Sequence, residues 1–183
     1  FVISIVMAIQ FAPIWGTSLD GFTSHVPWLN KLGVTLDLGV DSVAMMLVLL
    51  TTLLTPLCVL GSFSAITFRV KEYYAWLLIL ETAMVGVFAA QDIILFYVSF
   101  ELTLVPMFFL IAIYGGKNRA HASIKFFIYT FTGSLFTLAG LLYVAWTYKE
   151  THLYDTWSFA IHDLAKFAST DLSATEQGWI LLA

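Results

Sequence analysis

The sequence predicts an all-α protein that crosses a membrane several times, and three features of its composition support this fold class. Of its 183 residues, 60% are hydrophobic and 11% are charged, whereas a soluble globular domain has about 25% charged residues. Its mean hydropathy is +0.90. The charges cluster and leave long neutral stretches, because no ionisable side chain except Cys58 falls within 42–68 and only tyrosines do within 126–148. Both stretches exceed the roughly 20 apolar residues that a helix needs to cross a bilayer.

The composition also excludes several other classes of protein. A soluble bundle of buried helices would need amphipathic outer helices, and no stretch of the sequence is recognised as one. The net charge of −4 provides no basic stripe for nucleic acid. Cys58 is the one cysteine, so an intrachain disulfide is excluded. Because phosphate-loop, dinucleotide and Cys/His metal motifs are absent from the sequence, we expect no metal, cofactor or redox chemistry on this chain.

Five membrane spans and the start of a sixth are predicted within one membrane domain, 1–183. The spans cover about 1–14, 43–68, 73–90, 93–114 and 123–148, and the sixth begins near Gly178. Two long connections, 17–40 and 149–177, are predicted to be outer loops. Within the first, Val34–Leu38 alternates as a short strand does. The chain begins and ends inside apolar runs, so we expect it to be a piece of a longer protein.

The loops predict an orientation in the membrane. The connections 69–72 and 115–122 must lie on one side, because two spans separate them. They carry four basic residues and one acid, whereas the other connections are predominantly acidic. An excess of Lys and Arg marks the cytoplasmic or matrix side of a membrane. The basic connections are therefore predicted to lie inside.

Two carboxylates interrupt otherwise apolar spans, and they are the first candidates for chemistry. Glu81 and Glu101 each lie ten residues from Gln91 in the tight turn between two spans. At 1.5 Å per residue, both are about 15 Å below the outer surface. Acids at this depth often mark proton or ion pathways. A protonated glutamate that serves only helix packing is the alternative, and it has more weight for Glu81 than for Glu101.

Whether the two acids face each other depends on helix rotation, which the sequence leaves open. Neither of their spans contains a lysine or arginine, so a cationic partner has to come from another span. Pro106, five residues after Glu101, removes a backbone donor and can loosen the helix one turn back. The alternative is a kink without function.

Lys125 and His121 are weaker candidates, near the inner end of the fifth span. Lys125 is followed along the span by hydroxyl-bearing side chains, and it could feed protons inward from the inner side. A lysine at a span end more commonly extends to the interface. His121 could add a group that titrates near neutral pH, although a histidine in a loop is commonly no more than an exposed side chain.

The run Phe96–Ile111, with Leu104-Val105-Pro106-Met107 following Glu101, resembles the signature span of a known family. This family comprises the antiporter-like subunits of proton-pumping NADH:quinone oxidoreductase, and the run is most similar to its subunit M branch, called subunit 4 in mitochondria. Lys125–Thr130 with Gly133-Ser134 resembles the family's next span, and Leu38–Asp41 resembles the entry to an earlier one. The likeness extends over nearly the whole chain.

The resemblance implies an antiporter-like fold with inverted repeats, of which this chain would hold the N-terminal part. It implies that Glu101 pairs with a lysine beyond Ala183, and that the partners are other membrane-arm subunits, neighbouring antiporter-like subunits among them, and lipid. FMN, iron–sulfur clusters and quinone would lie elsewhere in the complex. The membrane would be a bacterial plasma membrane or a mitochondrial inner membrane. Two alternatives stay open: a subunit of a multi-subunit cation/proton antiporter, and a structural scaffold.

Overall fold

The computed structural model describes residues 1–11, 23–29, 34–152 and 157–170, together with Leu172, Thr175, Gln177, Gly178 and Ile180. Within these residues the elements follow in the order α1 (Val2–Phe11), β1 (Thr23–Leu29), β2 (Val34–Gly39), α2 (Ser42–Ser62), α3 (Val70–Ala89), α4 (Ile93–Tyr114), α5 (Arg119–His152) and α6 (Ile161–Thr170).

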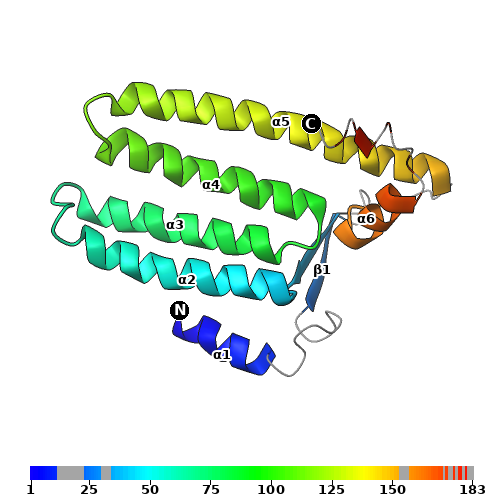
Figure 1. The fold of residues 1–183 in the computed structure, drawn as a ribbon, viewed down its shortest axis with the longest axis horizontal. Coiled ribbons are helices and arrows are strands. Elements are labelled where there is room, and N and C mark those ends of the chain that lie inside the picture. The colour runs from blue at the N-terminus through cyan, green and yellow to red at the C-terminus, as the bar shows by residue number, and fades with distance from the viewer. Residues whose placement is uncertain are drawn as a thin grey trace.

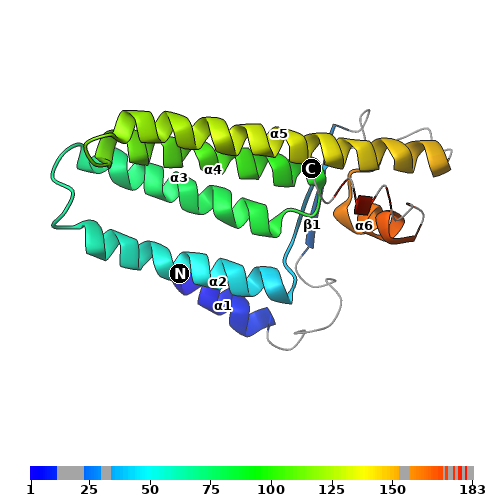
Figure 2. The same cartoon turned by 45° about the horizontal axis from the view of Figure 1, so that its top comes forward.

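Helices α2 to α5 lie side by side in chain order, and each runs antiparallel to the one before it (Figure 1). α1 lies beside α2 in both ribbon views (Figure 2). Among the described residues, these four helices are long and apolar enough to cross a membrane, and α1 is a shorter apolar helix. The predicted fold class, an all-α bundle of membrane helices, is confirmed.

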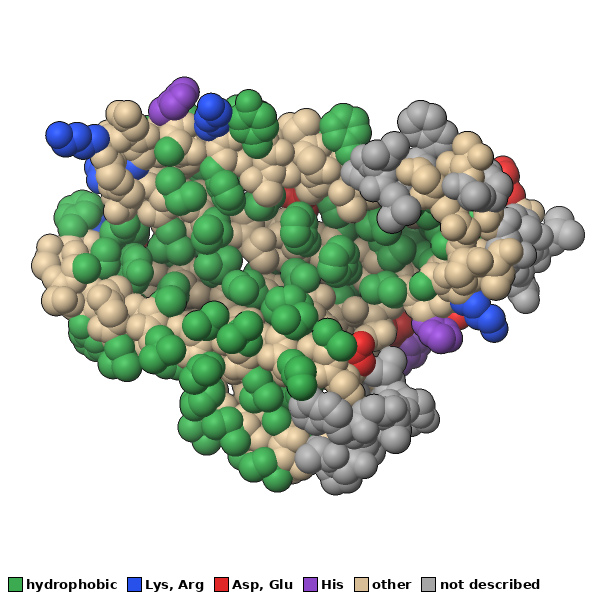
Figure 3. Space-filling model, viewed as in Figure 1, with side chains coloured by type: hydrophobic (Ala, Val, Ile, Leu, Met, Phe, Trp, Pro, Cys, Tyr) green, Lys and Arg blue, Asp and Glu red, His purple; other side chains and the backbone are tan. Residues whose placement is uncertain are grey.

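The surface of the bundle is apolar along most of its length. Figure 3 shows hydrophobic side chains over the helices on this face, with Lys and Arg side chains gathered towards the end where α4 turns into α5. Large apolar side chains on α2 and α5 are strongly exposed, among them Leu60 (65%) and Phe136 (62%). Such a band would be costly in water and is expected where lipid is the solvent.

The helix bounds differ from the expected spans at several ends. α4 has the expected bounds, 93–114. α2 ends at Ser62, six residues before the expected 68, where the backbone tightens and the Phe63 N–H donates to Leu60 O (3.4 Å). The expected span was too long because residues 63–68 carry no charge, although they form the turn after the helix. α5 extends beyond 123–148 at both ends, because charged residues that favour helices continue it past the apolar core.

Two predicted segments fall partly outside the described residues. α1 ends at Phe11, and residues 12–14 of the first expected span are not described. Gly178 and Ile180 are helical, but their neighbours Trp179 and Leu181 are outside the described residues, as is most of the segment before β1.

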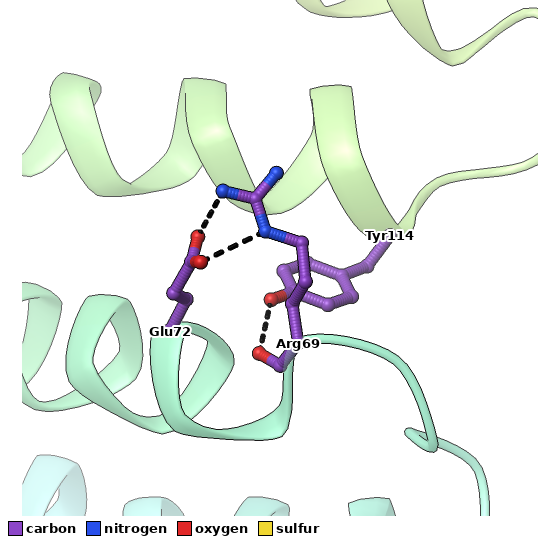
Figure 4. A network of polar contacts seen from close by, with 3 residues as sticks. All are labelled: Arg69, Glu72 and Tyr114. Atoms are coloured by element: carbon purple, nitrogen blue, oxygen red, sulfur yellow. Dashed lines mark hydrogen bonds and ion pairs between the residues drawn. The ribbon is translucent and has the colours of Figure 1, made fainter.

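α3 begins three residues earlier than expected because Arg69 closes its first turn. Arg69 has left-handed backbone geometry (φ 49°), and its side chain forms an ion pair with Glu72 in the first turn (Figure 4). The Arg69 carbonyl accepts a hydrogen bond from the Tyr114 hydroxyl at the end of α4 (2.8 Å). The two basic connections, 69–72 and 115–122, therefore lie at the same end of the bundle.

The opposite end carries two elements that the sequence did not predict. β1 pairs with β2 in an antiparallel hairpin, and β2 covers the strand expected at Val34–Leu38. α6 is amphipathic, with Leu164 and Phe167 buried in an apolar cluster with Val144 of α5. The statement that the chain has no amphipathic helix is therefore wrong. The helix was missed because it has only ten residues, which is too few for a clear helical repeat of apolar residues.

The turn between α3 and α4 forms backbone hydrogen bonds with β2 and with the segment that leads into α6. The Gln91 N–H donates to Asp37 O of β2 (2.8 Å), while Gln91 O accepts from the Ile161 N–H (2.9 Å). The Ile93 N–H donates to Phe159 O (2.9 Å). These bonds attach the hairpin and the segment before α6 to the start of α4, which fixes the first turn of the helix that carries Glu101.

Asp92 caps α4 at this point and is fully buried. Its Oδ1 accepts from the N–H groups of Ile94 (2.7 Å) and Leu95 (3.3 Å), whereas Oδ2 has no hydrogen-bond partner among the described residues. Burial raises the pKa of Asp92 above its usual 3.8, the capping N–H groups oppose this, and the charge of Asp37 adds to it. The folded chain therefore holds this proton more tightly than the unfolded chain does.

An Asp92→Asn variant is expected to make the stability of the full-length protein less sensitive to pH. Since the folded pKa is raised, the contribution of Asp92 to stability is fully present below the ordinary value of 3.8 and is lost as pH rises through the raised value. Asn caps a helix about as well as Asp but cannot ionise. Thermal unfolding in detergent should show the variant melting above wild type at pH 8, with the difference shrinking at pH 4. An equal difference at both pH values would contradict this account.

Candidate functional site

Glu101 lies inside α4 and contacts α5. Its carboxylate accepts a hydrogen bond from the Ser134 hydroxyl. Glu101 is half-buried and Ser134 is 5% exposed. Glu101 is eight positions after Ile93, the first residue of the helix, which places it about 12 Å from that end. The acid is therefore well within the apolar span and is hydrogen-bonded across a helix interface.

Two contacts fix how α3 and α4 are aligned. Trp76 of α3 stacks on Phe109 of α4, with ring centroids 4.5 Å apart. Ten residues further along α3, Gly86 lies against Ser99, where an added Cβ would be only 2.9 Å from the Ser99 hydroxyl oxygen. Because the two contacts are ten residues apart on each helix, the antiparallel register is constant between them.

This register places the two intramembrane acids at nearly the same depth. Glu81 lies midway between the two contacts on α3, so it is level with Leu104, which lies midway between them on α4. Leu104 is three residues beyond Glu101, an axial difference of about 4.5 Å.

The two acids face opposite directions. Glu101 is two residues after Ser99, a rotation of about 200°, so it points away from α3 and towards α5. Glu81 is seven residues after Tyr74, nearly two whole turns, and therefore shares the face on which Tyr74 contacts Ser62 of α2. The structure thus does not bring the carboxylates together. Within the part of the chain that the structure describes, Glu81 makes no hydrogen bond or ion pair.

A cavity of about 480 Å³ lies between α4 and α5, and Ser134, the hydrogen-bond partner of Glu101, is part of its lining. Its lining includes the hydroxyl-bearing side chains Tyr97, Tyr129, Thr130, Ser134 and Thr137, together with phenylalanine rings. Tyr97 lies one turn before Glu101 and interacts with both Glu101 and Ser134. A cavity of this size with several hydroxyls has the room and the polar partners to hold water.

Lys125 is exposed on α5, and the structure does not place it beside Glu101. It lies nine residues before Ser134, about 13 Å along the helix and half a turn round from it. Its ammonium lies over the Tyr129 ring, 5.9 Å from the centroid. Because Tyr129 lines the cavity, it is the residue that connects Lys125 with the surroundings of Glu101.

Pro106 lies inside α4 as expected, whereas His121, expected in a loop, lies in the first turn of α5. His121 is exposed near the start of α5, one turn before Lys125. Pro106 is buried within α4, and it cannot donate to the carbonyl of Leu102. In the described ranges, no group of three or more His, Cys, Asp or Glu side chains could hold a metal ion.

Sequence reasoning missed the role of two residues at this site. The sequence shows Ser134 as one of the hydroxyl-bearing residues of the fifth span, but its contact with Glu101 depends on how α4 packs on α5. Tyr97 was not singled out, although residues four apart share a helix face and its spacing from Glu101 is a usable signal.

Comparison with known proteins gives a family match and several similar proteins. A family model described as NADH:quinone oxidoreductase/Mrp antiporter, transmembrane, matches residues 90–182, more than half of the chain. NADH-quinone oxidoreductase subunit M of Rickettsia conorii is 40% identical over 143 residues, which cover 78% of this chain and 28% of that protein. The chain therefore spans less than a third of the length of this curated relative.

Two solved structures share the fold. One chain of respiratory complex I from Thermus thermophilus with bound NADH matches with a TM-score of 0.73 at 24% identity, over 97% of this chain and 35% of that one. A chain of the Mrp complex from Dietzia sp. matches with a TM-score of 0.69 at 20% identity, over 98% of this chain and 19% of that one. At these identities the likeness shows the fold alone.

Proposed function

Because this chain belongs to the transmembrane family shared by NADH:quinone oxidoreductase and the Mrp antiporters, we propose that it is part of a proton-translocating membrane-arm subunit of an NADH:quinone oxidoreductase. The observation that carries the proposal is Glu101, a half-buried carboxylate inside a span that accepts a hydrogen bond from Ser134. An acid retained at this depth costs about 2.5–3.5 kcal/mol on insertion scales. Such groups commonly serve proton movement.

In this role Glu101 takes up a proton from the hydroxyl-lined cavity and releases it again. The Ser134 hydroxyl stabilises the charged form of Glu101, and the cavity provides a place for water beside the carboxylate. Electron transfer then occurs on other subunits, where FMN, iron–sulfur clusters and quinone are bound. The partners of the chain are other membrane-arm subunits. The cationic partner of Glu101, which its own span does not contain, is a lysine beyond Ala183.

A cation/proton antiporter subunit is the second candidate, favoured by the likeness to the Mrp complex. The identity to subunit M of Rickettsia conorii favours the first candidate. A third possibility, a structural scaffold, predicts that Glu101 can be replaced without effect on proton movement.

The orientation is part of the proposal. The connections 69–72 and 115–122 lie at one end of the bundle and hold four basic residues. The opposite end carries the hairpin, Asp92 and α6. Since Lys and Arg mark the inner side, Glu101 would receive protons from the side of the basic connections and release them towards the hairpin.

Sealed inside-out vesicles that contain the full-length subunit in its complex test both the function and the orientation. We expect NADH oxidation to acidify the vesicle lumen without any requirement for sodium. In a subunit whose own cysteines, Cys58 included, are replaced, a Lys117→Cys variant should react with a membrane-impermeant thiol reagent added outside, because its connection faces the former cytoplasm. A matched Lys166→Cys variant on α6 should be protected.

Proton movement that depends on a sodium gradient and not on NADH would favour the antiporter. The reverse labelling pattern, with Lys166→Cys reactive and Lys117→Cys protected, would overturn the orientation while leaving the function as it stands.

A further inference from the structure

The hydroxyl of Ser134 has two acceptors within reach but only one proton to donate. One acceptor is the Glu101 carboxylate on α4, and the other is the Phe131 carbonyl oxygen one turn back on α5, at 2.9 Å. A serine hydroxyl donates one hydrogen bond and accepts up to two. Its proton can therefore satisfy only one of these acceptors at a time.

We propose that Ser134 is a positioning residue that reverses its hydrogen bond whenever Glu101 gains or loses a proton. The inference rests on the proposed function, since it requires Glu101 to change its charge during turnover. With Glu101 ionised, the Ser134 hydroxyl donates to the carboxylate. With Glu101 protonated, the carboxyl O–H donates to Ser134, whose own proton turns to the Phe131 carbonyl.

The proton balance of this exchange is simple. One O–H bond forms on Glu101 when a proton arrives, and the same bond breaks when the proton leaves. The Ser134 O–H bond rotates but never breaks. Because both states keep a hydrogen bond between the two side chains, neither state leaves this buried pair without its hydrogen bond, a loss that would be destabilising.

Among the described side chains of α5, Ser134 is the one that donates to Glu101. Ser134 is 5% exposed, and Tyr97 is the other ionisable side chain that interacts with the pair. Glu81 lies on the far face of α3, and Lys125 lies on the far face of α5. In the part of the chain that the structure describes, the donor to the Glu101 carboxylate from the neighbouring helix is thus this one hydroxyl.

The test compares Ser134→Ala with Ser134→Thr in the full-length subunit, assembled in its complex. Hydrogen bonds to charged groups contribute about 1.5–3 kcal/mol, so Ser134→Ala is expected to pump protons about tenfold more slowly. Ser134→Thr keeps the hydroxyl and should retain most of the activity. Thr103→Ala is the matched control, because among the described residues the Thr103 hydroxyl bonds to a carbonyl of its own helix, Phe100 O, at 2.7 Å, and to no other group.

Infrared difference spectra give a readout that a purely structural role would not change. The carboxyl band of protonated Glu101, identified by its loss in Glu101→Gln, should shift to higher frequency in Ser134→Ala and stay in place in Ser134→Thr and Thr103→Ala. An unshifted band with normal pumping in Ser134→Ala would overturn the inference. If Glu101→Gln itself pumped normally, the proposed function would fail instead, and the two failures are therefore distinguishable.

Discussion

A Glu101→Gln variant of the full-length subunit, assembled in its complex, is expected to pump protons at least about tenfold more slowly than wild type. Gln has nearly the same shape and can still accept from Ser134, but it cannot take up and release a proton. A positioned acid–base group contributes about 10²–10⁴-fold to proton transfer. The measurement is the initial rate of proton uptake by proteoliposomes after NADH is added.

A Glu101→Asp variant distinguishes the effect of the acid group from the effect of its position. Aspartate remains an acid, but its shorter side chain withdraws the carboxylate from Ser134. We expect pumping between that of wild type and that of Glu101→Gln. Equal losses in both variants would show that the hydrogen bond to α5 matters as much as the proton itself. Full activity in both would remove Glu101 from the pathway and favour the scaffold.

The second large effect is expected at Gly86 of α3, which lies directly against Ser99 of α4. A Cβ at Gly86 would be 2.9 Å from the Ser99 hydroxyl oxygen and 3.3 Å from the Ser99 Cβ. Small residues permit such close helix contacts in membranes. Gly86→Val is therefore expected to destabilise the protein by about 1–3 kcal/mol, as overpacking does elsewhere, seen as a lower temperature of thermal unfolding in detergent.

Gly61→Val is the matched control, because a Cβ at Gly61 meets no atom within 4 Å. Both glycines lie in membrane helices, so the change in helix propensity is similar and the contact with Ser99 is the difference. Equal destabilisation by the two variants would show that the close approach of α3 to α4 is not the cause. Because this contact also sets the rotation of α4, Gly86→Val is expected to lower proton pumping as well.

The sequence predicted the membrane helices where local signals agree. α4 has the expected bounds because Asp92 caps one end and two glycines follow the other, so capping and hydropathy indicate the same residues. α2 was expected to be too long because Phe63 and Phe68 are apolar without being helical. α6 and β1 were missed because short elements obtain their stability from contacts with other parts of the chain, which no local pattern records.

The candidate site was predictable only in part, for the same reason. A charge within an apolar run identifies Glu101 and Glu81, and residue counting from Gln91 gives their similar depth. The rotation of α4 depends on Trp76 against Phe109 and on Gly86 against Ser99, contacts between segments that are far apart in sequence. These contacts turn Glu101 towards Ser134 and leave Glu81 on the other side of α3.

The number of protons moved per NADH oxidised tests the central claim most directly, because it normalises for the amount of assembled complex. It is measured in the same proteoliposomes for wild type and Glu101→Gln, with Thr103→Ala as the control. The proposed role of Glu101 predicts that this ratio falls in Glu101→Gln and is unchanged in Thr103→Ala. An unchanged ratio in Glu101→Gln would contradict it, and Glu101 would then be a packing residue in a membrane scaffold.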